Sequence, residues 1–67
     1  MPNEWNRYMG PHITPNQYAA QGGDENSIRR DLQDLWGDPA QGKDYMTPDD
    51  ITHTAQRLAR LLPEKGQ

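Results

Sequence analysis

Residues 46–63 read MTPDDITHTAQRLARLLP and carry the clearest helix signal in the chain. Thr47 is a residue type that caps helices, Pro48 follows at the first helical position, and Asp50 stands where a capping box closes. Apolar residues then recur every three to four positions, as they do on the buried face of a helix: Ile51, Ala55, Leu58, Ala59 and Leu62. The proline at position 63 follows these residues and is expected to end the helix. The pattern predicts a helix over 48–62.

The same start signal occurs earlier, in the sequence ITPNQY at residues 13–18. Thr14 is the expected cap and Gln17 closes the expected capping box. An apolar pair flanks each of the two caps, which is typical of a hydrophobic staple. Two glycines at positions 22 and 23 favour the positive φ at which many helices end. The sequence therefore predicts a short helix over 15–21.

A third helix is predicted over 24–36, between these two. Its apolar residues fall within an arc of about 100° on a helix and should face inward: Ile28, Leu32, Leu35 and Trp36. Gly37 is expected to end the helix in a left-handed conformation, and the proline at position 39 prevents its continuation. Residues 37–46 are then expected to form a loop.

The composition favours an all-α fold for one small domain spanning residues 1–67. Ile and Leu together number eight, and Val and Phe are absent, so a β-sheet is not expected and the core must be thin. Residues 1–12 are expected to form an irregular aromatic segment, in which Trp5, Tyr8 and Met9 have the spacing of one helical turn. The sequence predicts a three-helix domain whose first helix is short and whose aromatic side chains enlarge the core.

No catalytic or metal-binding pattern stands out, so we do not expect an enzyme, a cofactor or a metal site. The chain has no Cys and a single Ser, Ser27, and neither His12 nor His53 lies in a ligand spacing. No apolar stretch is long enough to cross a membrane, and the N-terminus lacks the pattern of a secretory signal. We therefore expect a cytoplasmic protein.

The thin core suggests protein binding, because large aromatic side chains that it covers incompletely tend to mark interfaces. Tyr45 and the aliphatic Leu61 are also expected to be incompletely buried. Arg57 and Arg60 share a face of the last predicted helix with His53 and suit an acidic partner, although they also complement the helix dipole. The expected partner is another protein or a second copy in a homodimer. The candidate partner-binding residues are Trp5, Tyr8, Trp36, Arg57 and Arg60.

Residues 22–35, GGDENSIRRDLQDL, suggest a different function. They resemble the turn and recognition helix of DeoR-type winged-helix repressors, in which a glycine turn and a cap precede the pattern TIRRDLxxL. The resemblance implies a helix-turn-helix DNA-binding regulator that uses the 24–36 helix. Four side chains of types that contact base edges would share its outward arc: Asn26, Arg29, Arg30 and Gln33.

Two observations favour protein binding over this alternative. The chain has seven basic and ten acidic residues, a net charge of −3, whereas phosphate contacts require basic surfaces. Arg30 and Asp34 also have the spacing of a solvated ion pair on an ordinary amphipathic helix.

Overall fold

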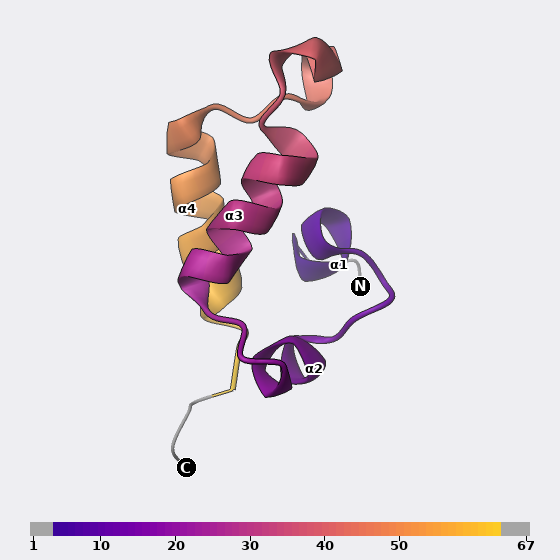
Figure 1. The fold of residues 1–67 in the computed structure, drawn as a ribbon, viewed down its shortest axis with the longest axis vertical. Helices are drawn as coiled ribbons and strands as arrows, with labels where there is room; N and C mark the ends of the chain where they lie inside the picture. The colour runs from indigo at the N-terminus through magenta and orange to yellow at the C-terminus, as the bar shows by residue number, and fades with distance from the viewer. Residues whose placement is uncertain (1–3, 64–67) are drawn as a thin grey trace.

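The computed structural model describes residues 4–63, and all regular structure in that range is helical (Figure 1). The three predicted helices are present, and the described chain adds two short helical segments. In chain order the elements are α1 (Glu4–Met9), α2 (Pro15–Ala20), α3 (Glu25–Trp36), the 3-10 helix η1 (Pro39–Asp44) and α4 (Pro48–Ala59). The all-α fold class predicted from the sequence is thereby confirmed.

Both predicted capping boxes form. The hydroxyl of Thr47 accepts a hydrogen bond from the backbone N–H of Asp50 at 3.2 Å, and the Asp50 carboxylate accepts one from the Thr47 N–H at 3.3 Å. Thr14 and Gln17 exchange the equivalent bonds at 3.1 and 3.0 Å. Each box satisfies N–H groups that the first helical turn leaves without partners. The threonines therefore set where α2 and α4 begin.

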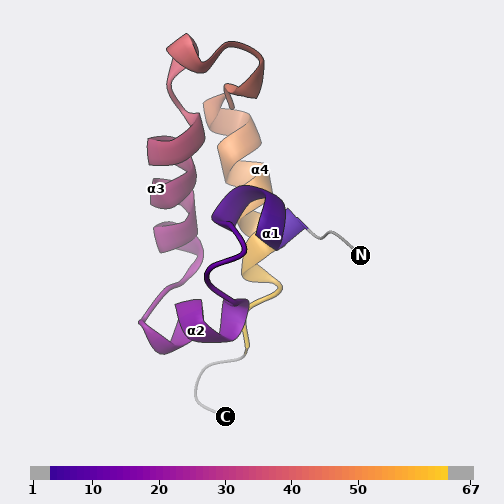
Figure 2. The same ribbon diagram turned by 90° about the vertical axis from the view of Figure 1, so that its right-hand side faces the viewer.

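The long helices α3 and α4 form an antiparallel pair that organises the molecule. They lie side by side and are joined at one end by η1 (Figure 1). The short helix α1 lies against one face of this pair, and α2 lies crosswise near the opposite end from η1 (Figure 2). A chain with few aliphatic residues thus closes its core with two short helices instead of one further long helix.

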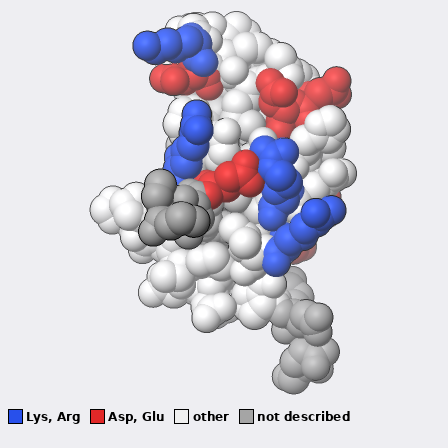
Figure 3. Space-filling model, turned by 180° about the vertical axis from the view of Figure 1, so that it is seen from behind, with Lys and Arg blue, Asp and Glu red and all other residues white. Residues whose placement is uncertain are grey.

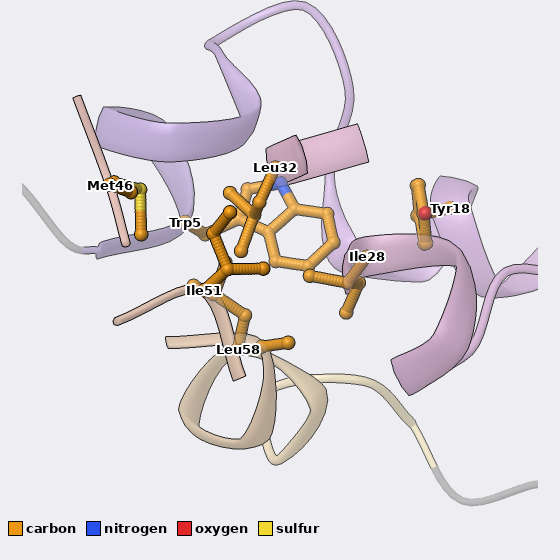
Figure 4. Close-up of a cluster of buried hydrophobic side chains, with 8 residues drawn as sticks. Trp5, Tyr18, Ile28, Leu32, Met46, Ile51 and Leu58 are labelled. Carbon is orange, nitrogen blue, oxygen red and sulfur yellow. The ribbon is translucent and has the colours of Figure 1, made fainter. Parts of the chain in front are cut away.

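The core lies where α1 meets the α3–α4 pair (Figure 4). The indole of Trp5 is only 1% exposed and projects among aliphatic side chains from both long helices. Its Nε1 donates a hydrogen bond to the Ile13 carbonyl at 2.8 Å, and its ring meets that of Tyr18 edge to face at 5.4 Å. The other buried apolar side chains are Ile28, Leu32, Met46, Ile51, Ala55 and Leu58.

The N-terminal segment is more regular than the sequence predicted, because the helical turn that the spacing of Trp5, Tyr8 and Met9 indicated extends over residues 4–9. Trp5 was expected at a partner-binding surface, and that expectation is wrong. The cause is the thin core: a buried indole removes more apolar surface from water than a leucine does, so α1 folds around Trp5. Trp5 stabilises the fold and is not accessible to a partner.

The loop predicted at residues 37–46 contains the six-residue helix η1. Asp38 caps it, since its carboxylate accepts a hydrogen bond from the Ala40 N–H at 3.0 Å. Within η1, Gly42 has a φ of +67°, which interrupts the helical path. The Met46 N–H then donates to the Trp36 carbonyl at 2.7 Å. This bond places Met46, the residue before the cap of α4, beside the last residue of α3.

Three helix ends differ in detail from the predictions. The last helix was expected to reach residue 62, but α4 ends at Ala59, because the next three N–H groups bond to carbonyls three residues back and tighten the final turn. The short helix ends at Ala20, one residue early, although Gly22 has the expected positive φ of +86°. Gly37 has a φ of −93°, so α3 ends without the left-handed residue that the sequence suggested.

Leu35 was expected in the core and is instead 52% exposed. It lies at the edge of the apolar arc of α3, whereas Ile28 and Leu32 are fully buried. The helix α2 lies beside the start of α3 (Figure 1), and its contact through the Tyr18–Asp31 hydrogen bond comes one turn before Leu35. The C-terminal turn of α3 therefore leaves this leucine in solvent.

Candidate protein-binding cleft

A cleft of about 400 Å³ opens where α1, the end of α3, η1 and the first turns of α4 come together. Its volume falls in the range of ligand-binding sites in proteins. The lining combines aromatic, basic and acidic side chains from segments far apart in the sequence: Arg7, Tyr8, Trp36, Lys43, Asp44, Tyr45, Met46, Asp50, His53, Thr54 and Arg57. The fold thus gathers residues from both ends of the chain around one hollow.

Two aromatic side chains of the cleft, Tyr8 and Trp36, pack against each other. Tyr8 and Trp36 meet edge to face, with ring centroids 5.9 Å apart and planes at 84°. The Trp36 Nε1 donates a hydrogen bond to the Tyr8 carbonyl at 3.3 Å. Tyr8, Trp36 and Tyr45 are all partly buried. They therefore offer apolar surface to a ligand at little further cost in side-chain entropy.

Charged side chains of both signs lie at the cleft. The guanidinium of Arg7 lies over the Tyr8 ring, 5.4 Å from its centroid, and Lys43 and Arg57 bring the cations to three. The carboxylates of Asp44 and Asp50 oppose them, and Glu4 pairs with Arg57 at the edge of the cleft, so three cations face three carboxylates. Figure 3 shows one face of the molecule on which Lys and Arg side chains gather, with acidic side chains among them. The whole chain, by contrast, carries −3.

Arg57 already holds one carboxylate at the edge of the cleft. Its Nε donates to both oxygens of Glu4 at 3.0 Å, and its Nη2 lies 2.8 Å from the Glu4 Oε2. Nη2 also donates to the hydroxyl of the buried Thr54 at 3.2 Å. The hydrogen bond from Arg57 lowers the pKa of Glu4, and the same bond raises the pKa of Arg57. The arrangement fixes the guanidinium and shows that this position accommodates a carboxylate.

Three of the five predicted partner-binding residues meet in this cleft: Tyr8, Trp36 and Arg57. Trp5 is in the core, and Arg60 is exposed immediately after α4 but does not line the cleft. Sequence reasoning missed Arg7 and Lys43. Each lies one or two positions before a tyrosine of the cleft, in RY at 7–8 and KDY at 43–45, and that pairing was the available signal.

The residues of the DNA-binding alternative lie elsewhere, on the exposed face of α3. Asn26, Arg29, Arg30 and Gln33 are all exposed. Arg29 donates to the side-chain oxygen of Asn26 at 2.6 Å, and its neighbours form a shallow depression that shares no residue with the cleft. The expected ion pair between Arg30 and Asp34 does not form within residues 4–63.

Tyr18 joins this helix to α2. Its hydroxyl donates to the Asp31 carboxylate at 2.8 Å, and burial together with this hydrogen bond raises the pKa of Tyr18. The ring also occupies the space beside Gly23, where a Cβ would lie 2.2 Å from it. A glycine at this position is therefore required for the turn between α2 and α3.

Within the described part of the chain, no group of three His, Asp or Glu side chains is placed to hold a metal ion. None of the helices in residues 4–63 is both long and apolar enough to cross a membrane. Comparison of the chain with protein-family models, curated proteins and solved structures gave no match, so the repressor resemblance depends on residues 22–35 alone.

Proposed function

We propose that this chain is a small cytoplasmic regulatory or adaptor protein that binds another protein through the cleft. The observation that carries the proposal is the meeting of Tyr8, Trp36 and Arg57, three residues singled out for partner binding, around one hollow. Trp, Tyr and Arg are the residue types most enriched among the side chains that dominate binding energies at interfaces. A second copy of the chain remains the alternative partner.

The cleft suits a side chain of a partner better than a broad flat contact. Its lining combines aromatic rings with two cationic side chains, Arg7 and Lys43, and includes the buried Met46. Aromatic surface ringed by polar groups is the usual anatomy of the centre of an interface. The partner would therefore insert a projecting residue and hold it with charged groups around the rim.

The proposal is tested by site-specific photo-crosslinking. Replacing Tyr45 with benzoylphenylalanine puts a crosslinker in the cleft at a partly buried aromatic position, and the same substitution at the exposed Gln33 on α3 is the matched control. We expect a nuclease-insensitive crosslink to one protein species from position 45 and none to that species from position 33. Crosslinking from position 33 alone would contradict the proposal, and a crosslink to the chain itself would identify a homodimer.

DNA binding through α3 is the second candidate function, favoured by the joint exposure of Arg29, Arg30 and Gln33 on one helix. A gel mobility-shift assay tests it with duplex DNA. If α3 reads DNA, the Arg29→Ala/Arg30→Ala change abolishes the shift, and the affinity of the unmodified protein falls steeply between about 50 and 200 mM salt. An unchanged shift in the Tyr45→Ser variant would then separate this surface from the cleft.

A further inference from the structure

We infer that two copies of this chain associate by exchanging α1, so that the Trp5 of each copy fills the core of the other. The inference goes beyond the proposed function, because it concerns how the chain assembles and not what the cleft binds. Three features of the described residues support it: the contacts of α1, the turn that follows α1, and the small core that α1 completes.

The contacts that hold α1 in place are made with residues beyond the turn at 10–12. They join α1 to four later positions in the chain: Trp5 to Ile13 and Tyr18, Tyr8 to Trp36, and Glu4 to Arg57. None of these contacts requires that both residues belong to one chain. The α1 of a second copy therefore fits the same place with the same partners, which is why exchange of an identical element is a low-cost route to a dimer.

Residues 10–12 connect α1 to the segment that leads into α2, and their turn lays α1 on the long helices (Figure 2). The turn depends on Gly10, whose φ is +93°, a conformation that residues with a Cβ rarely adopt. Pro11 follows and favours an extended conformation for the residue before it. Three extended residues span about 10 Å, roughly the diameter of a helix. An extended turn therefore moves α1 off its own copy and onto an adjacent one.

The small core explains why α1 requires a folded copy, its own or a second one. A helix of six residues is unstable in water by itself, and α1 has one buried side chain, Trp5, which is 1% exposed. Because this indole is enclosed, exchange takes place while the chains fold. Glu4 and Arg7 leave α1 with no net charge, so the −3 of a second chain does not repel it. Domains of this size commonly gain stability by association.

In the exchanged dimer each cleft is built from two chains. Arg7 and Tyr8 come from one copy, whereas Trp36 and Tyr45 come from the other. Two complete clefts remain open to a partner. Exchange is therefore compatible with protein binding at the cleft.

Crosslinking between two singly substituted chains tests the inference, because the natural chain has no Cys. Glu4→Cys and Arg57→Cys chains are unfolded together, refolded at high protein concentration and treated with a short bis-maleimide. We expect a covalent heterodimer, since exchange brings position 4 of one chain beside position 57 of the other. The matched control pairs Glu4→Cys with Gln33→Cys on the exposed face of α3 and should give no heterodimer. Equal yields from both pairs, or no heterodimer from either, would overturn the inference.

Sedimentation of two glycine variants gives a second, independent measurement. Gly10→Ala puts a Cβ into open space but strains the positive φ of the closed turn, and the extended turn of the dimer lacks this strain. We expect the dimer association constant to rise at least about tenfold. The matched control is Gly42→Ala, also in open space with a positive φ, which strains η1 in monomer and dimer alike. Its association constant should stay within about twofold of that of the unmodified protein.

The outcomes separate the inference from the proposed function. Monomers alone, in the unmodified protein and in Gly10→Ala, would overturn the inference and leave the cleft as a protein-binding site. A dimer that Gly10→Ala does not strengthen would also overturn it, because its copies would touch through their outer surfaces. An exchanged dimer whose position 45 crosslinks to no other protein would contradict the adaptor function and leave the inference standing.

Discussion

Two leucines three positions apart in α3 have opposite roles. Leu32 is fully buried between α1 and α4, and Leu35 is 52% exposed. We expect Leu32→Ala to lower the free energy of unfolding by about 2 to 4 kcal/mol, because it leaves a cavity in a core of few side chains. Leu35→Ala should cost less than about 1 kcal/mol. Chemical denaturation followed by circular dichroism measures both, and equal losses would show that the C-terminal turn of α3 is buried.

The two tryptophans also differ, and the sequence did not distinguish them. Trp5 donates its indole N–H to Ile13 within the core, and Trp36 donates its own to Tyr8 at the edge of the cleft. Trp5 stands among polar residues and Trp36 follows Leu35 in the apolar arc of its helix, but an indole in either position fits the core or an interface. Only the packing of α1 against the long helices decides which one remains accessible.

At the level of the helices, the N-terminal cap of α4 is a small interaction with a measurable effect. Thr47 and Asp50 exchange hydrogen bonds at 3.2 and 3.3 Å. Thr47→Ala removes the side-chain acceptor and should destabilise the protein by about 1 kcal/mol, a large share of the stability of so small a domain. Thr47→Ser keeps a hydroxyl and serves as the control in thermal denaturation. A loss of the same size in both variants would point to a cause other than the cap.

Caps and periodicity predicted α2, α3 and α4, because these signals depend on nearby residues. The predicted starts at Pro15 and Pro48 agree with the structure, and so does the end of α3 at Trp36. Neither α1 nor η1 was assigned as a helix, because the spacing of Trp5, Tyr8 and Met9 indicated only one turn and Pro39 was interpreted as the stop signal of α3. The local start signal of η1, the Asp38 cap followed by Pro39, was therefore present in the sequence, whereas the conformation of α1 depends on the burial of Trp5 against the long helices.

Across the whole molecule, the Glu4–Arg57 pair connects the first helix to the last. Because Arg57 lowers the pKa of Glu4, ionised Glu4 favours the folded state above its ordinary pKa of 4.5, and this contribution is lost as the pH falls through the lower folded value. The stability difference between the unmodified protein and Glu4→Gln should therefore shrink as the pH falls below 4.5. The pair is exposed, so about 1 M NaCl at neutral pH should also reduce the difference.

Thermal denaturation of the unmodified protein and of the Glu4→Gln variant, from neutral pH to below 4.5, measures this difference in stability. A difference that is constant from neutral to acidic pH would contradict the link between Glu4 and Arg57. A difference that grows on acidification would contradict the direction of the pKa shift.

The cleft was only partly foreseeable from the sequence. Tyr8, Trp36 and Arg57 were identified by residue type, but their meeting depends on how α1 crosses the α3–α4 pair. Lys43 comes from η1, which the sequence indicated only as a loop. Residue chemistry thus predicted what a binding site would contain, and the tertiary arrangement determined where those residues converge.

The central claim is that the cleft, and not the outer face of α3, is the binding surface. The chain has two tryptophans, so an ¹⁵N-labelled sample gives two indole N–H signals in NMR spectra, one from the core and one from the cleft. On titration with the partner protein identified by crosslinking from position 45, we expect the Trp36 indole and the backbone amides of Lys43 and Tyr45 to shift while the Trp5 indole stays in place. Shifts confined to the amides of Arg29, Arg30 and Gln33, with both indoles unchanged, would contradict the claim.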